Sequence, residues 1–137
     1  MMADEVASST MGQRPGEMAS QYEKDVLSIH PSEHAQLSLT SLPLYGTNFL
    51  VWRRAVYVSL GTKMKLGFID GSFPKPAAGS VIFEQWRRVD LMVISWSWNS
   101  MSKDIVESFM YCNTSRELWL AIQARYGRSN GPLIYQL

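Results

Sequence analysis

The hydrophobic residues of this chain recur at helical spacing, and the pattern predicts an all-α fold. The first helix follows Gly46, takes Thr47 or Asn48 as its N-cap and stops at Gly61. A short polar side chain at an N-cap accepts from backbone N–H groups that the first turn leaves unpaired. The apolar positions of this helix share one face, and they are Phe49, Trp52, Val56 and Leu60.

A longer helix is predicted over residues 81–101, with Ser80 as its cap. The segment is too long for a strand and lacks strict alternation of apolar and polar residues. It carries two apolar stripes, and a helix that is apolar on two sides packs between neighbours, so we expect it to be central. One stripe holds Ile82, Trp86, Val89, Val93 and Trp96, and the other holds Leu91, Ile94, Trp98 and Met101.

Two shorter helices are predicted after the long one. The first follows Ser102. The second begins at Thr114 and ends at Gly127, because Thr114 and Glu117 fit a capping box in which each side chain satisfies a backbone N–H of the other residue. The inward positions are Ile105, Val106, Phe109 and Met110 in the first of these helices and Leu118, Trp119, Ile122 and Tyr126 in the second.

The connector over residues 61–80 is predicted to be mostly irregular. Asp70-Gly71 indicates a turn, since glycine tolerates a positive φ, and Pro74 with Pro76 excludes a helix there. Three apolar residues of the connector can enter the core, namely Leu66, Phe68 and Ile69. The fold class is therefore a small bundle of about four helices with a long, Trp-rich central helix.

Charge and composition divide the chain into a tail and a domain. Residues 1–36 hold six acidic and two basic residues, few apolar residues and no sustained period, so we expect a flexible acidic tail. Residues 37–137 hold eleven basic and six acidic residues and form the helical domain. That basic balance suits an anionic partner, although an ordinary solvated surface explains it equally well.

Composition also narrows the class of protein. Hydrophobic residues make up 46% of the chain, which is typical of a globular domain. No apolar run approaches the roughly 18 residues that a membrane span needs, and the N-terminal residues lack the apolar core of a secretory signal. Cys112 is the one cysteine, which fits a reducing compartment, so we expect a cytoplasmic protein with no membrane partner.

His30-Pro-Ser-Glu33-His34 matches H-x-x-E-H, the zinc signature of inverzincin peptidases. That chemistry needs both histidines on one helical face, Glu33 as general base and a third protein ligand. Pro31 fits only the first turn of a helix, the motif lies in the polar tail, and the chain has no further histidine. We therefore expect no metal site.

Other catalytic chemistry is equally weak in this sequence. Cys112 has no histidine near it in sequence, and a cysteine in an apolar-rich stretch is more often a small core residue than a nucleophile. The glycines do not form a phosphate-binding loop, and no C-x₂-C pair exists for a zinc finger. We expect no catalytic residues, no cofactor, no small-molecule substrate and no enzymatic activity.

Two Trp-Arg-Arg runs, at residues 52–54 and 86–88, place aromatic and basic side chains next to each other. This combination can stack on the bases of single-stranded nucleic acid. However, Trp52 and Trp86 lie on apolar stripes, and the arginines that follow face the other way. Core packing is therefore the favoured interpretation of both tryptophans.

The order and spacing of these motifs resemble the N-terminal Gag region of plant copia-type LTR retrotransposons. The resemblance covers about residues 28–137, including residues 42–52 (LPLYGTNFLVW), 66–76 (LGFIDGSFPKP), 86–92 (WRRVDLM) and 129–137 (SNGPLIYQL). The His-Pro-Ser-Glu-His segment is similar to the lead-in of that family. The positions that carry the signature are Gly46, Asn48, Trp52, Asp70, Gly71, Trp86, Trp96, Thr114, Glu117 and Trp119.

The resemblance implies a mostly helical, capsid-like region that self-associates into particles packaging element RNA. In that family the zinc knuckle and the protease lie further along the polyprotein, so RNA binding here would be indirect. The sequence ends about one turn after Pro132, which could open another helix, so we expect a domain truncated at its C-terminal end. A non-functional remnant of an element is an alternative.

Two working functions follow from the sequence. The leading one is a structural module that self-associates through the exposed members of a set of four residues, Tyr57, Leu91, Trp98 and Tyr135. The other is a nucleic-acid-binding module that uses Arg53, Arg54, Arg87 and Arg88.

Overall fold

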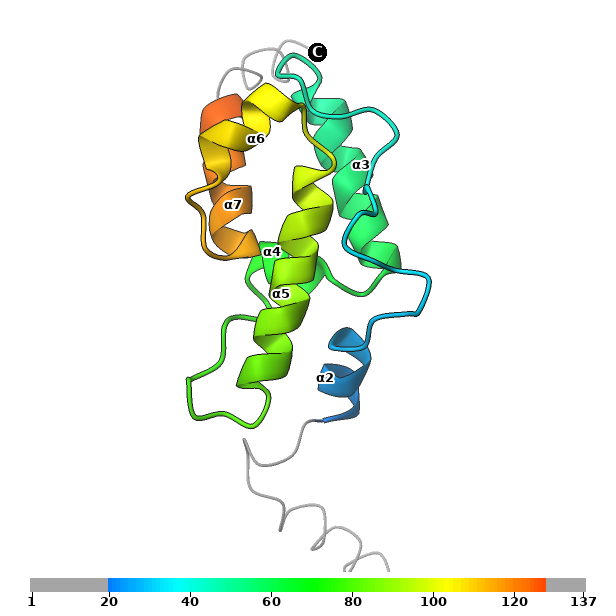
Figure 1. The fold of residues 1–137 in the computed structure, drawn as a ribbon, viewed down its shortest axis with the longest axis vertical. Helices are drawn as coiled ribbons and strands as arrows, with labels where there is room; N and C mark the ends of the chain where they lie inside the picture. The colour runs from blue at the N-terminus through cyan, green and yellow to red at the C-terminus, as the bar shows by residue number, and fades with distance from the viewer. Residues whose placement is uncertain (1–19, 128–137) are drawn as a thin grey trace, which may run out of the picture.

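The structure is a computed structural model, and it describes residues 20–127. These residues form six α-helices and one π-helical turn, with no strand among them, which confirms the all-α fold (Figure 1). An isolated β-bridge joins Leu44 to Met101. The elements are α2 (Gln21–Val26), α3 (Phe49–Thr62), α4 (Leu66–Asp70), α5 (Phe83–Trp98), α6 (Lys103–Phe109), α7 (Ser115–Ile122) and the π-helical turn η1 (Gln123–Gly127).

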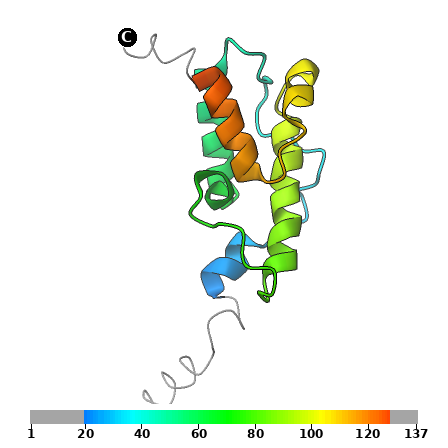
Figure 2. The ribbon, with the colours of Figure 1, turned by 90° about the vertical axis from the view of Figure 1, so that its left-hand side faces the viewer.

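The three longest helices share the long direction of the molecule, and α7 lies in front of α3 and beside α5 when the molecule is turned (Figure 2). Helix α7 contacts α4, α5 and α6 and continues directly into η1, which contacts α3. Helix α2 packs at the opposite end of the molecule from α6 (Figure 1). The core therefore lies between α3, α5 and α7, with α4 closing it from below.

Aromatic rings fill this core. Trp52 of α3 stacks on Trp119 of α7 with ring centroids 6.1 Å apart, and Phe68 of α4 stacks on Trp86 of α5 at 5.4 Å. All four apolar positions predicted for the first helix are buried, which confirms that face. Burial of each such side chain stabilises the fold by roughly 1.5–3 kcal/mol.

The second apolar stripe predicted for the long helix is confirmed at two of its four positions, one of which is the buried Met101. The buried residues of α5 instead form one wide face, and Leu91 lies outside it with 46% of its surface exposed. Ile94 is buried, whereas Trp98 is only partly buried. Met110, predicted to point inward from α6, follows the last residue of that helix and is exposed, because the chain turns there towards α7.

The predicted helix ends are close to the observed ones, with informative differences. Helix α3 runs through Gly61 to Thr62, and the left-handed residue that follows is Met64, with a φ of 59°. Asn48 occupies the N-cap position, but its side chain accepts from the Tyr45 N–H and donates to the Pro43 carbonyl. It therefore braces the preceding loop and leaves the first turn of the helix uncapped.

The predicted cap of the last helix is half confirmed. The Thr114 hydroxyl accepts from the Glu117 N–H at 3.0 Å. The Glu117 carboxylate reaches back as expected, but it accepts from the N–H of Asn113, one residue earlier than the capping box requires. Ser80 likewise accepts from the Ile82 N–H although α5 begins at Phe83.

The prediction of a flexible tail is wrong for residues 20–36, and residues 1–19 lie outside the described part of the chain. Ser20 and Glu23 form a capping box that begins α2, and Val26 and Leu27 are buried. Lys65 holds this segment down, because its buried ammonium group donates to the Ser28 carbonyl at 2.8 Å. Burial lowers the pKa of Lys65, while the nearby carboxylate of Glu33 acts in the opposite direction.

Ser100 joins the N-terminal loop to the end of α5. Its hydroxyl accepts from the Leu39 N–H and donates to the Trp96 carbonyl, both at 2.7 Å. Its carbonyl accepts from the Leu44 N–H and from the indole of Trp52. A fully buried serine thus satisfies polar groups of three separate segments.

We expect Ser100→Ala to lower the free energy of unfolding by about 1–3 kcal/mol, because the buried N–H of Leu39 loses its acceptor. Ser97→Ala is the matched control, since the Ser97 hydroxyl is also buried but donates only to the Val93 carbonyl of its own helix. Urea unfolding of both variants measures the difference. Equal losses would show that the Ser100 contact with Leu39 contributes little.

Candidate functional site

Three of the signature tryptophans attach loops to the helical core. Each indole ring is buried, and each indole N–H donates to a backbone carbonyl of a non-helical segment. This arrangement confirms that Trp52 and Trp86 pack in the core. The pairs are Trp52 with Ser100 at 2.6 Å, Trp86 with Phe73 at 3.1 Å and Trp96 with His34 at 2.7 Å.

The glycine and aspartate of the signature shape two turns. Gly46 and Gly71 have φ values of 113° and 86°, a region that side chains with a Cβ rarely adopt. The Asp70 carboxylate accepts from the Ser72 N–H at 2.8 Å and closes the second turn. A Cβ on Gly71 would also lie 3.3 Å from Nε of Arg116, whose guanidinium donates to the Ile69 carbonyl.

A buried polar contact that the sequence did not predict lies where α4, α5 and α7 meet. Asp90 is fully buried, and it accepts from the N–H and the hydroxyl of Ser115, the first residue of α7. The Ser115 hydroxyl also lies 3.3 Å from the carbonyl of Phe68. The available signal was the position of Asp90 on the apolar stripe between Trp86 and Val93.

Burial raises the pKa of Asp90, since removal from water disfavours the charged carboxylate. The hydrogen bonds from Ser115 and the positive charges of Arg87 and Lys75 act in the opposite direction but do not cancel this effect. The carboxyl group therefore binds its proton more tightly in the folded chain than in the unfolded chain.

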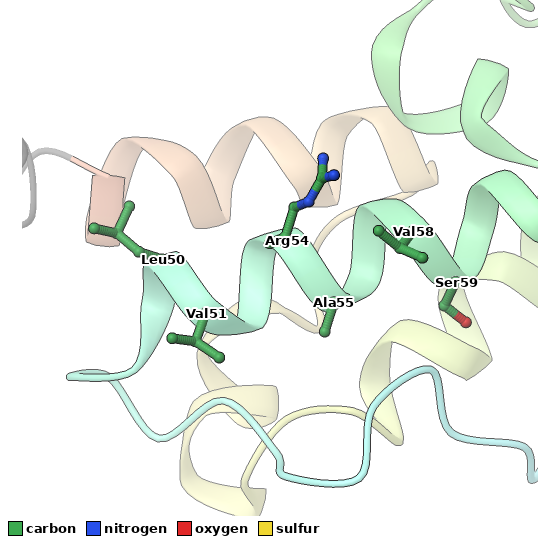
Figure 3. A pocket seen from close by; sticks show the side chains of 6 residues that line it. All are labelled: Leu50, Val51, Arg54, Ala55, Val58 and Ser59. Atoms are coloured by element: carbon green, nitrogen blue, oxygen red, sulfur yellow. The ribbon is translucent and has the colours of Figure 1, made fainter.

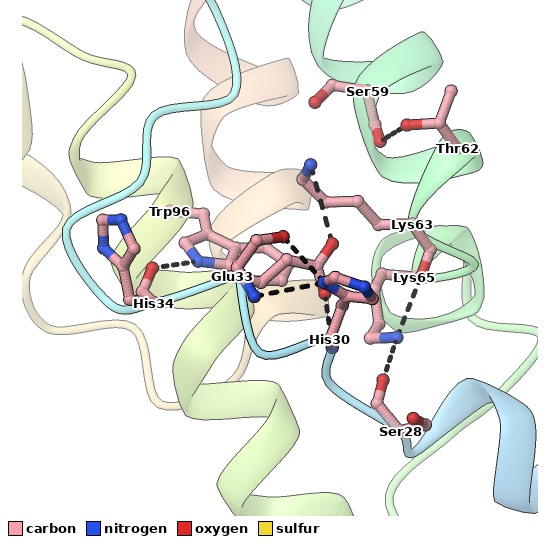
Figure 4. Close-up of polar contacts among 10 residues, drawn as sticks. Ser28, His30, Glu33, His34, Ser59, Thr62, Lys63, Lys65 and Trp96 are labelled. Atoms are coloured by element: carbon pink, nitrogen blue, oxygen red, sulfur yellow. Dashed lines mark hydrogen bonds and ion pairs between the residues drawn. The ribbon is translucent and has the colours of Figure 1, made fainter.

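The two histidines of the H-x-x-E-H segment do not share a helical face. Residues 31 and 32 form a turn, and the Glu33 carboxylate accepts from the His30 N–H at 3.0 Å and pairs with Lys63 at 3.7 Å (Figure 4). His34 uses its backbone carbonyl to hold Trp96, which Figure 4 also shows. No group of three potential metal ligands occurs in residues 20–127.

Cys112 is buried, which confirms its interpretation as a small core residue. Burial raises the pKa of the Cys112 thiol, and the nearby Glu117 carboxylate acts in the same direction. Both effects disfavour the thiolate that a nucleophilic cysteine needs.

Comparison with known proteins matches this chain to retrotransposon sequences. Residues 30–77, which include α3, α4 and the loops around them, match the family described as Gag-polypeptide of LTR copia-type. The chain carries a copia-type Gag-like N-terminal region. This finding agrees with the resemblance that the sequence motifs indicated.

A curated relative of this Gag-like region is the retrovirus-related Pol polyprotein from transposon RE2 of Arabidopsis thaliana. The two are 25% identical over 103 residues, which cover 69% of this chain. The chain spans only about 7% of the length of that polyprotein. No solved structure matches the chain.

The Gag-like region exposes several large apolar side chains. Of the four proposed interface residues, Tyr57 and Leu91 are each 46% exposed, Trp98 is partly buried, and Tyr135 lies outside the described residues. Further exposed residues gather on α3 and on the loop before it. Within residues 20–127, no helix is both long and apolar enough to cross a membrane.

We expect the stability of the wild-type Gag-like region to decline as the pH rises above the ordinary carboxyl value of about 4 and through the raised pKa of Asp90. The reason is that the folded chain favours the protonated carboxyl, so its contribution is fully present only at lower pH. Asp90→Asn should remove this part of the pH dependence and unfold at a higher urea concentration than wild type at neutral pH.

Thermal or urea unfolding at a series of pH values measures this effect. Asp104→Asn is the control, because Asp104 is exposed on α6. A constant difference between wild type and Asp90→Asn at every pH would show that Asp90 does not titrate in the range tested.

Proposed function

We propose that this chain is a non-enzymatic structural Gag protein of a copia-type retrotransposon that acts in the cytoplasm and associates with copies of itself into particles. The match of residues 30–77 to the copia-type Gag polypeptide carries the proposal. In this proposal, the ten signature residues act by shaping the fold, with no role in chemistry.

The distribution of apolar side chains supports an assembly role. Four of the five tryptophans are buried and hold the helices and loops together. Meanwhile the outer surface keeps apolar side chains on more than one side, among them Val51 on α3, Leu91 on α5 and Leu120 on α7. Exposed apolar patches are typical of surfaces that bind other proteins.

A second candidate function, direct RNA binding, is favoured by one surface of α3. Arg53 and Arg54 are exposed there, and together with Leu50 and Tyr57 they line a hollow of about 270 Å³. The Arg54 guanidinium lies 5.9 Å from the centroid of the Tyr57 ring. An aromatic ring beside two arginines is a suitable platform for a nucleic-acid base and its phosphate.

For self-association, we expect the average mass of the 137-residue chain to rise with concentration above the monomer value of 15.6 kDa. Sedimentation equilibrium over about three decades of concentration measures this mass. A mass that stays at the monomer value at the highest soluble concentration would contradict the proposed function.

For RNA binding, Arg53→Glu with Arg54→Glu should abolish binding of a single-stranded RNA and its steep dependence on salt, because the arginines neutralise phosphates. Arg87→Glu with Arg88→Glu on α5 is the matched control, because it reverses two charges at another site and should leave RNA binding by the α3 surface in place. Fluorescence anisotropy at several salt concentrations measures binding. Binding that is absent or independent of salt in the wild-type chain would remove this candidate.

A further inference from the structure

Helix α3 is apolar on two opposite sides, although only one side faces the core. Its buried side holds Phe49, Val56 and Leu60. The opposite side holds Val51, Ala55 and Val58, which repeat at spacings of four and three residues. A helix that is apolar on two sides is normally covered on both, yet Val51 is 74% exposed.

This outer side of α3 forms one continuous apolar surface with the loop before it, and we call it the α3 face. Figure 3 shows Val51, Ala55 and Val58 along the helix, while Arg54 points away from Val51 and Ala55, towards α7. These residues border an open depression of about 720 Å³. An adjoining hollow of about 290 Å³ shares Val51 and Ala55 and adds Leu42 and Tyr45 of the loop.

Resting on the self-association proposed above, we propose that the α3 face binds the α3 face of a second copy of this chain around a twofold axis. The two α3 helices cross in antiparallel directions near Ala55. Each copy thereby contributes the same surface to the contact, as a twofold dimer requires.

The pattern of side-chain sizes on the α3 face is complementary to itself. Ala55 is the small residue between two valines, so it leaves room for a side chain of the other copy. The midpoint between Val51 and Val58 lies next to Ala55, and an antiparallel crossing there sets Val51 of one copy against Val58 of the other. The valines of each copy then fill the depression above Ala55 of its partner.

The charges around the α3 face fit a second copy better than a polyanion. No acidic residue borders the depression or the adjoining hollow, and Arg54 is the one charged residue that does. A twofold axis places the two Arg54 side chains at opposite edges of the contact, where each guanidinium stays in water. The contact is therefore apolar, and added salt should not weaken it.

The area of the α3 face indicates a weak contact. A helix of 14 residues is about 21 Å long, and a stable dimer buries roughly 800 Å² on each partner. One side of α3 with Leu42 and Tyr45 provides less than that. We expect a dissociation constant on the order of micromolar to millimolar, which suits a contact that is repeated many times in a particle.

The experiment combines crosslinking with charge substitution in the full 137-residue chain. Ala55→Cys in a Cys112→Ala background places a thiol at the crossing point, where the two Cα atoms can reach the roughly 4.4–6.8 Å that a disulfide needs. Val81→Cys in the same background is the control, because Val81 is also exposed but lies before α5. Oxidation with copper phenanthroline should give a dimer of Ala55→Cys at least about ten times faster than of Val81→Cys.

Val51→Asp with Val58→Asp should raise the dissociation constant at least about tenfold and leave the thermal unfolding of the monomer unchanged, since both side chains point into solvent. Val81→Asp with Met110→Asp is the matched control at exposed apolar sites outside α3. Sedimentation equilibrium at low and high salt measures association of all these chains.

The outcomes separate the α3 face from self-association in general. A wild-type chain that stays monomeric contradicts the proposed function. If the wild-type chain and the Val51→Asp, Val58→Asp variant associate equally and Ala55→Cys does not crosslink, the α3 face is not the contact. Self-association through another surface then still stands. A valine variant that unfolds at a lower temperature as a monomer overturns the α3 contact too, because another part of the same chain then covers the face. Association that weakens steeply with salt likewise overturns it, because the contact between copies is then electrostatic and not apolar.

Discussion

The fold depends on three indole N–H groups that are buried and still paired. A buried donor without a partner costs about 1–3 kcal/mol, so the carbonyl that meets each of these three indole rings stabilises it in the core. In this chain the carbonyls come from Ser100, Phe73 and His34, none of which lies in a helix. The same groups that fill the core therefore fix the paths of the connecting segments.

This constraint explains why such short helices make a stable arrangement. Helices of five to eight residues, such as α4, α6 and α7, are not stable alone. Their order comes from contacts between elements: the Thr114 cap, the Asp90 contact with Ser115 and the stacking of Trp52 on Trp119. Loss of one such contact removes the support of more than one element, so the domain is expected to unfold as a unit.

The sequence predicted the helices where periodicity and end signals agreed. Phe49 to Leu60 and the start at Thr114 are such cases, because apolar spacing and capping chemistry are local properties. It failed where the deciding partner is distant in sequence. Lys65 binds Ser28, and Ser100 binds Leu39, so the composition of residues 20–36 alone wrongly suggested a flexible tail. Asp90 was overlooked because the hydrogen-bond partner that explains a polar residue on an apolar stripe, Ser115, is 25 residues away in sequence.

The buried ammonium group of Lys65 has a consequence for where the folded unit begins. It donates to the carbonyls of Ser28 and Lys63. Only Lys63 lies within residues 37–137, the helical domain that charge and composition predicted. A chain that starts at residue 37 would lack the Ser28 carbonyl that accepts from Lys65 and the Glu33 carboxylate that pairs with Lys63. The Lys65 ammonium group would then be open to water. Residues 20–36 thus cover one side of the core, and an evolutionary deletion of this segment would have to replace Lys65 as well.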